Sequence, residues 1–249
     1  MTEPADGVLF IHAFPLDAGM WLEQARAARA DGWRVAAPSL PGFGGTPDAG
    51  TITSMGAAAN RCLQALDAEG IERAVVCGLS MGGYVAFELW REARQRVAGL
   101  LLANTRAGAD TEDSAASRRA LATRLRAEGT GFLVEDPPPL LSGNASDELW
   151  ESVKHTIADQ PAAAIAAAAD GMAHRPDSTA DLGTIDVPTL VLTSQGDTLI
   201  APDVSLSMVD RIAGAESVTL ARAGHLSNLE APDAFTSELR AFLERFERA

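Results

Sequence analysis

Short apolar runs and longer amphipathic segments alternate along most of the chain. Six runs of four to seven residues are apolar enough to form strands buried on both faces, namely residues 8–11, 33–37, 74–77, 97–103, 188–193 and 217–220. The segments with apolar residues at helical spacing, several of which begin with Ser, Asp or Pro as helices do, are residues 18–30, 54–69, 82–94, 202–212 and 232–246. The alternation predicts an α/β fold, in which helices cover both faces of a mostly parallel sheet.

The alternation is interrupted between the fourth and fifth runs. Residues 105–185 contain apolar segments at helical spacing but no convincing strand. Two clusters of helix-breaking residues, Pro137-Pro138-Pro139 and Ser142-Gly143-Asn144, divide this stretch. A helical lid inserted after the fourth strand is the simplest interpretation. We therefore expect a core domain made of residues 1–104 and 186–249, and a cap made of residues 105–185.

Length and charge narrow the class of protein. A chain of 249 residues with 47% hydrophobic content is long enough to bury one large core. Its 34 acidic and 20 basic residues give a net charge of −14, which repels nucleic acids and anionic lipid surfaces. We therefore expect neither a nucleic acid partner nor a membrane partner.

The apolar segments indicate where the protein is located and whether its cysteines are reduced. No apolar run approaches the roughly 18 residues of a membrane span, and the start lacks the basic residues of a secretory signal. These features predict a cytoplasmic protein. Cys62 and Cys77 lie in apolar segments, which favours two reduced core thiols over a disulfide. We find no metal-ligand cluster in the sequence and expect no cofactor.

A glycine-rich turn supplies the first candidate for catalysis. The segment Gly78-Leu79-Ser80-Met81-Gly82-Gly83 follows an apolar strand pattern and precedes a helical pattern. This is the strand, sharp turn and helix context of a nucleophile elbow, in which nearby glycines let the strand and helix approach closely. The helix amino terminus also favours developing negative charge. We predict that Ser80 is the nucleophile, the alternative being a glycine-rich loop with a solvated serine.

A serine nucleophile needs a general base, usually a histidine oriented by a carboxylate. Of the four histidines, His225 follows the last predicted strand, where this kind of fold places the base. His12 ends the first predicted strand, and His155 and His174 lie in the predicted lid. We predict that His225 is the base and that His12 holds its loop by hydrogen bonds.

The acid is expected at another strand end between the serine and the histidine. Asp197 lies just after the predicted strand 188–193 and is our candidate. The rival strand end, after residues 97–103, carries Asn104, which has no negative charge to balance an imidazolium. Asp203 and Asp210 fall on the following predicted helix, where a carboxylate is usually a cap or a solvated side chain.

Two backbone amides are placed to bind an oxyanion. Met81 follows the predicted nucleophile at the start of a helix, and Phe14 follows the first predicted strand. Pro15 disfavours a helical conformation at Phe14 and so favours an extended one. We predict an oxyanion hole formed by the amides of Phe14 and Met81.

Five motifs together resemble the α/β-hydrolase superfamily: residues 10–15 (FIHAFP), 40–46 (LPGFGGT), the serine turn, Gly196-Asp197 and Gly224-His225. Residues 175–178 (RPDS), 185–188 (IDVP) and 224–230 (GHLSNLE) look like the branch of 3-oxoadipate enol-lactonases and small carboxylesterases.

This resemblance implies specific features of the sheet and the first loop. About six residues precede the first predicted strand, so we expect six strands without the family's leading antiparallel pair. The strand 33–37 then becomes an edge, which the amino tail or a second subunit would cover. Ala13 stands where the family usually has glycine.

The expected function is hydrolysis of a small carboxylic ester or lactone through an acyl-enzyme, by a monomer or homodimer. Leu140, Leu141, Trp150 and Met172 are candidates for an apolar pocket in the lid, or equally for its core. An enol-lactone carries a carboxylate, which Arg106 or Arg175 would bind if either points inward. Two alternatives remain: cofactor-free perhydrolysis of haloperoxidase type, and slow-turnover perception of a ligand.

Overall fold

One six-stranded sheet organises the part of the chain that the structure describes, residues 4–47, 50 and 52–248 of a computed structural model. Its strands are β1 (Gly7–Ile11), β2 (Arg34–Ala36), β3 (Ala74–Leu79), β4 (Val97–Ala103), β5 (Thr189–Ser194) and β6 (Glu216–Leu220). All neighbouring strands are parallel, in the order β2-β1-β3-β4-β5-β6. The predicted fold and the six predicted strands are confirmed.

Burial explains why the four inner strands consist mostly of apolar residues. Every residue of β1, β3, β4 and β5 is buried, as expected for inner strands covered on both faces. The edge strands differ, because Arg34 in β2 and Glu216 in β6 are exposed. The parallel register brings the carboxyl ends of the strands to one side of the sheet, where loops can carry functional groups.

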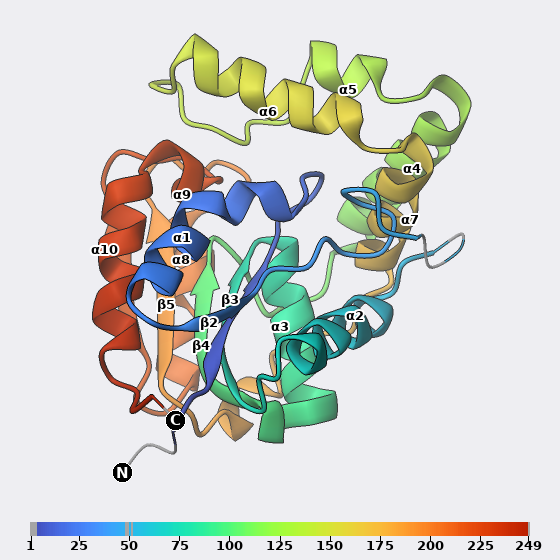
Figure 1. Ribbon diagram of the computed structural model, residues 1–249. Coiled ribbons are helices and arrows are strands. Elements are labelled where there is room, and N and C mark those ends of the chain that lie inside the picture. Colours follow the sequence, from blue (N-terminus) through green and yellow to red (C-terminus); the bar gives the residue numbers. More distant parts are fainter. Residues whose placement is uncertain (1–3, 48–49, 51, 249) are drawn as a thin grey trace.

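Helices pack in layers on the two faces of the sheet. Figure 1 shows α1 (Leu22–Ala30) and α10 (Pro232–Leu243) on one face, and α2 (Met55–Ala68) and α3 (Met81–Ala93) on the other. On the first face, Trp21 packs between Phe10 and Phe235, with ring centroids 5.1 and 5.6 Å apart. Two further short helices, α8 (Pro202–Leu206) and α9 (Ser227–Glu230), follow the ends of β5 and β6.

One predicted helix is interrupted. Residues 202–212 form only α8 and a 3₁₀ turn, Val209–Arg211, instead of one continuous helix. The hydroxyls of Ser205 and Ser207 bond the carbonyls of Thr105 and Val204. The Ser207 bond is local and competes with the regular helical pattern, whereas the Ser205 bond ties the segment to the residue after Asn104.

Four helices lie between β4 and β5 in the sequence: α4 (Glu112–Glu128), α5 (Gly131–Glu135), α6 (Asp147–Asp159) and α7 (Ala162–Ala173). Figure 1 shows them beside and above the carboxyl ends of the strands, with α4 packed on α7 and α5 near α6. Residues 137–144, which we call the strap, run between α5 and α6. We refer to α4–α7 and the strap together as the lid.

The amino-terminal residues that the structure describes do not pair with the edge strand β2. Ala5 instead forms a parallel bridge to Arg248, and the amide of Asp6 bonds the carbonyl of Arg73. Cys62 and Cys77 are buried free thiols, as predicted. None of the helices in the described ranges combines the length and the apolar character needed to cross a membrane.

Candidate active site

Ser80 occupies a sharp turn between β3 and α3. Its φ of 56° lies in the left-handed region, which a residue other than glycine adopts only when its surroundings hold it there. Its amide bonds the carbonyl of Ala103 at 2.9 Å, and its carbonyl accepts from Thr105 Oγ1 at 2.8 Å. The turn is also crowded, because a Cβ on Gly82 would lie 2.1 Å from the carbonyl oxygen of Ile11. The predicted elbow is therefore present, with its serine held at the start of a helix.

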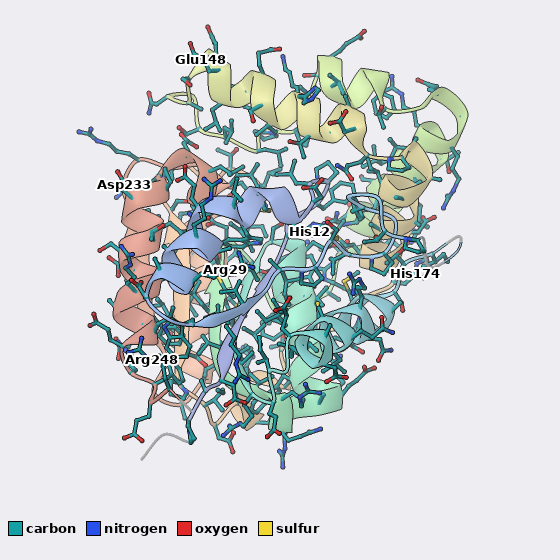
Figure 2. All side chains as sticks on the ribbon, viewed as in Figure 1. His12, Arg29, Glu148, His174, Asp233 and Arg248 are labelled. Atoms are coloured by element: carbon teal, nitrogen blue, oxygen red, sulfur yellow. The ribbon has the colours of Figure 1, made fainter. Side chains whose placement is uncertain are left out.

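His225 lies between β6 and α9 and contacts Ser80. Its Nε2 is 2.7 Å from Ser80 Oγ, and its Nδ1 is 2.8 Å from Asp197 Oδ2. A carboxylate only accepts hydrogen bonds, so Nδ1 carries the proton and Nε2 is left to accept from the serine hydroxyl. Figure 2 shows His174 at the periphery of the molecule, and His155 on α6 is exposed. Of the described histidines, His225 is thus the one placed against Ser80.

Asp197 follows β5 and is held at both carboxylate oxygens. Its Oδ1 accepts from the amides of Leu199 and Ile200 at 3.0 and 2.9 Å, and its Oδ2 accepts from Asn104 Nδ2 at 2.9 Å as well as from His225. Burial by itself raises the pKa of this carboxyl, but the hydrogen bonds and charge of its partners outweigh that and hold the pKa below its ordinary value. Asp197 is therefore ionised where it faces His225.

Asn104 joins the three strand ends beneath these residues. Its Nδ2 donates to Ser194 Oγ at 2.7 Å in addition to Asp197, and its Oδ1 accepts from Ser227 Oγ at 2.6 Å. The side chain is fully buried, and its φ of 45° is also in the left-handed region. The sequence pattern excluded Asn104 as the acid but did not predict this role. Its place at the end of β4, next to the strand that carries Asp197, was the available signal.

The two predicted oxyanion donors lie near the end of β1. A Cβ on Gly82 would also meet the His12 carbonyl oxygen at 3.2 Å, so the first turn of α3 packs directly on the loop that carries Phe14. The peptide bond between Phe14 and Pro15 is cis. Within the described part of the chain, neither the Phe14 amide nor the Met81 amide has a hydrogen-bond partner. Both N–H groups are thus free to bind an added acceptor.

His12 has the contacts of a structural residue. Its Nδ1 donates to the carbonyl of Ala13 at 3.0 Å, and its Nε2 accepts from the amide of Leu40 at 2.9 Å. Burial lowers the pKa of His12 to about 4. The ring is therefore neutral near pH 7 and links the first loop to the loop that follows β2, as the sequence analysis expected. Figure 2 shows it at the centre of the molecule, below the lid.

The predicted pocket residues of the lid differ in their surroundings. Leu140 is buried, and its carbonyl accepts from the amide of Leu226 at 2.8 Å, directly beside His225. Met172 is buried in α7. Trp150 is half-buried on α6 and lines a groove between that helix and the strap. Leu141, the fourth candidate, is also buried beside the histidine loop, because a Cβ on Gly224 would lie 2.6 Å from its carbonyl carbon. A role for any of the four in substrate binding stays a prediction.

Arg175 and Arg106, the predicted carboxylate ligands, are both paired with Asp110. Their guanidinium groups lie 2.9 and 2.5 Å from Asp110 Oδ1, and Arg118 Nε lies 2.6 Å from Oδ2. Burial favours protonation of Asp110, yet the charges and hydrogen bonds of Arg118 and Arg175 keep its pKa below the ordinary value. Arg175 also stacks over the Tyr84 ring at 4.0 Å. No contact of either arginine supports the prediction that it binds a substrate carboxylate.

Comparisons with known proteins identify the family of the chain. The sequence profile of the alpha/beta hydrolase family matches residues 8–238. The chain is 28% identical to 3-oxoadipate enol-lactonase 1 of Acinetobacter baylyi, over 97% of this chain and 90% of that protein.

Two solved structures are also similar to this chain. A malate-bound thermophilic esterase from Thermogutta terrifontis aligns with a TM-score of 0.92 and 38% identity, covering 98% of this chain and 91% of the other. The enol-lactonase from Burkholderia xenovorans aligns with a TM-score of 0.85 and 26% identity, covering 96% and 92%.

Proposed function

The chain belongs to the alpha/beta hydrolase family, and from that premise we propose that it hydrolyses small carboxylic esters or lactones through an acyl-enzyme on Ser80. The observation that carries the proposal is the pair of short contacts through His225, 2.7 Å to Ser80 Oγ and 2.8 Å to Asp197 Oδ2. A base within hydrogen-bond reach of a nucleophile, itself oriented by a third group, is the arrangement that activates a serine hydroxyl.

The first half of the reaction forms the acyl-enzyme. His225 Nε2 takes the proton of Ser80 Oγ while that oxygen attacks the ester carbonyl carbon, and the carbonyl electron pair moves onto its oxygen. The amides of Phe14 and Met81 donate to this oxyanion, and each such donor is worth about 3 kcal/mol in the transition state. The oxyanion then re-forms the carbonyl, the bond to the alcohol oxygen breaks, and that oxygen takes the proton from Nε2.

The second half releases the acid. A water molecule attacks the acyl carbon as Nε2 accepts its proton. The second oxyanion then re-forms the carbonyl, the bond between the acyl carbon and Ser80 Oγ breaks, and Oγ takes the proton from Nε2. Asp197 stays ionised throughout and stabilises the imidazolium that forms in each half. Its lowered pKa supports this role, because a protonated carboxyl would not balance the positive ring.

The substrate class rests on the relatives, which are named as an enol-lactonase and an esterase. We propose that residues 105–185 form a cap whose inner side selects the acyl group, and that the remaining residues form the core. Leu140 is the best supported lining residue because the adjoining backbone is bonded beside His225. Location in the cytoplasm and a monomeric or homodimeric state remain predictions.

The proposal is tested with nitrophenyl esters of increasing chain length and with a set of lactones. We expect Ser80→Ala to lower kcat/KM by at least about 10³-fold. Ser117→Ala, which changes an exposed serine of α4, is the matched control and keeps full activity. A fluorophosphonate probe should add its mass to the peptide that contains Ser80 in the wild type only.

Three outcomes would contradict the proposal. Equal activity of the wild type and Ser80→Ala would remove the serine from the mechanism. Tight lactone binding without turnover would point to ligand perception. Peroxide-dependent halogenation that exceeds ester hydrolysis would point to perhydrolysis.

A further inference from the structure

Glu230 lies at the end of α9, five positions after His225, and its side chain turns back toward the histidine loop. Its Oε2 accepts from the amide of Gly224 at 2.7 Å. Gly224 directly precedes His225, so this bond fixes the backbone on the amino-terminal side of the candidate base. Glu230 belongs to the segment that resembles known hydrolases, yet the proposed reaction uses only His225 from it.

The same carboxylate also binds the strap. Oε2 accepts from the amide of Ser142 at 2.9 Å, and Oε1 accepts from the Ser142 hydroxyl. Three donors from two segments therefore converge on one carboxylate. Hydrogen bonds to a charged acceptor are stronger than neutral ones, so this carboxylate is a firm joint between the lid and the histidine loop.

The backbone of the strap also lies close to the backbone of the histidine loop. The amide of Leu226 donates to the carbonyl of Leu140 at 2.8 Å, which fixes the residue after His225 as well. A Cβ on Gly224 would lie 2.3 Å from the Ser142 amide nitrogen, and one on Gly196 would lie 3.0 Å from Ser142 Cβ. The strap therefore rests on both the loop with His225 and the loop with Asp197.

We propose that Glu230 is a positioning residue that sets His225 by binding the strap and the histidine loop at once, so that the lid and the base move together. The proposal rests on the proposed function, because His225 matters only if it acts as a base. Small displacements of a catalytic group lower rates strongly, so a loosened histidine loop reduces kcat while Ser80 and Asp197 stay in place.

The test compares Glu230→Gln and Glu230→Ala with the wild type and with Glu244→Gln, an exposed glutamate after α10 that serves as the matched control. We expect kcat to fall about tenfold in Glu230→Gln and further in Glu230→Ala, with KM changed less than kcat. Ser142→Ala should give a smaller fall, because the Ser142 amide bond remains. Glu244→Gln should match the wild type.

A second measurement follows the histidine without substrate. The proton on His225 Nδ1, bonded to Asp197, should give a downfield NMR resonance in the wild type and in Glu244→Gln. The proposal expects this resonance to shift or broaden in Glu230→Gln.

Variants that lower only the melting temperature, with kcat and the resonance of the folded protein unchanged, would show that Glu230 merely stabilises the lid and would overturn the proposal. Failure of the proposed function is a separate result, since Ser80→Ala would then be as active as the wild type whatever Glu230 does.

Discussion

The sheet and the lid differ in how much of each element is buried and in how many polar contacts each makes with the rest of the molecule. The inner strands are buried along their whole length, and Ser80 and Asp197 follow the carboxyl ends of two of them, whereas His225 follows the edge strand β6. The lid helices bury much less, apart from α7. Of the 17 residues of α4 and the 13 of α6, the buried ones are Ala115, Ala122, Leu125, Val153 and Ile157.

The lid meets the core through hydrogen bonds as well as through buried apolar residues such as Leu140, Ile165 and Met172. Gln160, at the end of α6, accepts from the Gly44 amide at 2.8 Å and donates to Asp17 at 3.0 Å. The amide of Thr53 donates to the carbonyl of Ala167 in α7 at 3.0 Å. The inner strands of the sheet are held by apolar burial along their whole length, whereas the lid adds these polar contacts to the apolar residues that it buries. Chemistry and lid position should therefore respond to different substitutions.

The largest effect should come from Asp197, on the loop after β5, where a substitution should lower kcat without unfolding the protein. Asp197→Asn places an amide where His225 Nδ1 and Asn104 Nδ2 both donate. We expect kcat to fall by about 10⁴-fold, because the histidine loses both its tautomer and its charge partner. Ester turnover and circular dichroism measure the two properties, and Asp203→Asn on α8 is the control. Activity within tenfold of the wild type would place the acid elsewhere.

A difference between local and long-range interactions explains which features could be predicted from the sequence. Buried strands are runs of apolar residues, and a serine turn or a strand-end aspartate is a local signal, so the strands and the residues now found in contact at Ser80 were predicted. Asn104, Glu230 and Asp110 were not, because their roles depend on partners far away in the chain. The break in residues 202–212 coincides with hydroxyl contacts of Ser205 and Ser207 that no periodicity reveals.

A substitution just before the lid, at Asp110, should act on stability. Asp110→Asn leaves Arg175, with a side chain only 3% exposed, without its carboxylate. We expect the free energy of unfolding to fall by about 3 to 5 kcal/mol at pH 7. The folded-state pKa of Asp110 is lowered, so its stabilisation is present above the unfolded-state pKa and is lost as pH falls through the folded-state value.

Urea denaturation at pH 7 and at acid pH checks both statements, with Asp113→Asn on the exposed side of α4 as the control. The difference between wild type and Asp110→Asn should shrink as the pH falls below about 4. A loss under 1 kcal/mol at pH 7 would mean that the ion pairs of Asp110 add little to the free energy of unfolding. Apolar burial would then stabilise this region as it stabilises the sheet.

The smallest effect concerns the pH dependence of stability. His12, which follows β1, is buried, and its hydrogen-bond partners in the described part of the chain carry no charge. Its pKa is about 4 in the folded protein, below the roughly 6.5 of an unfolded chain. The unfolded state therefore binds more protons between these values, and stability rises with pH across this window. Between pH 7 and pH 4.5, His12 alone should remove about 2.5 kcal/mol of stability.

The measurement is urea denaturation of wild type, His12→Gln and His155→Gln at both pH values. His12→Gln should be less stable at pH 7 but should lose less stability on acidification, whereas His155→Gln, which changes an exposed ring, should follow the wild type. If His12→Gln does not fold, NMR titration of the wild type should show the His12 ring neutral down to about pH 4. Protonation of the folded protein near pH 6.5 would mean that the loop opens to water. The loop after β1 would then be less firmly packed than the inner strands, and the contrast between the sheet and the lid would fail.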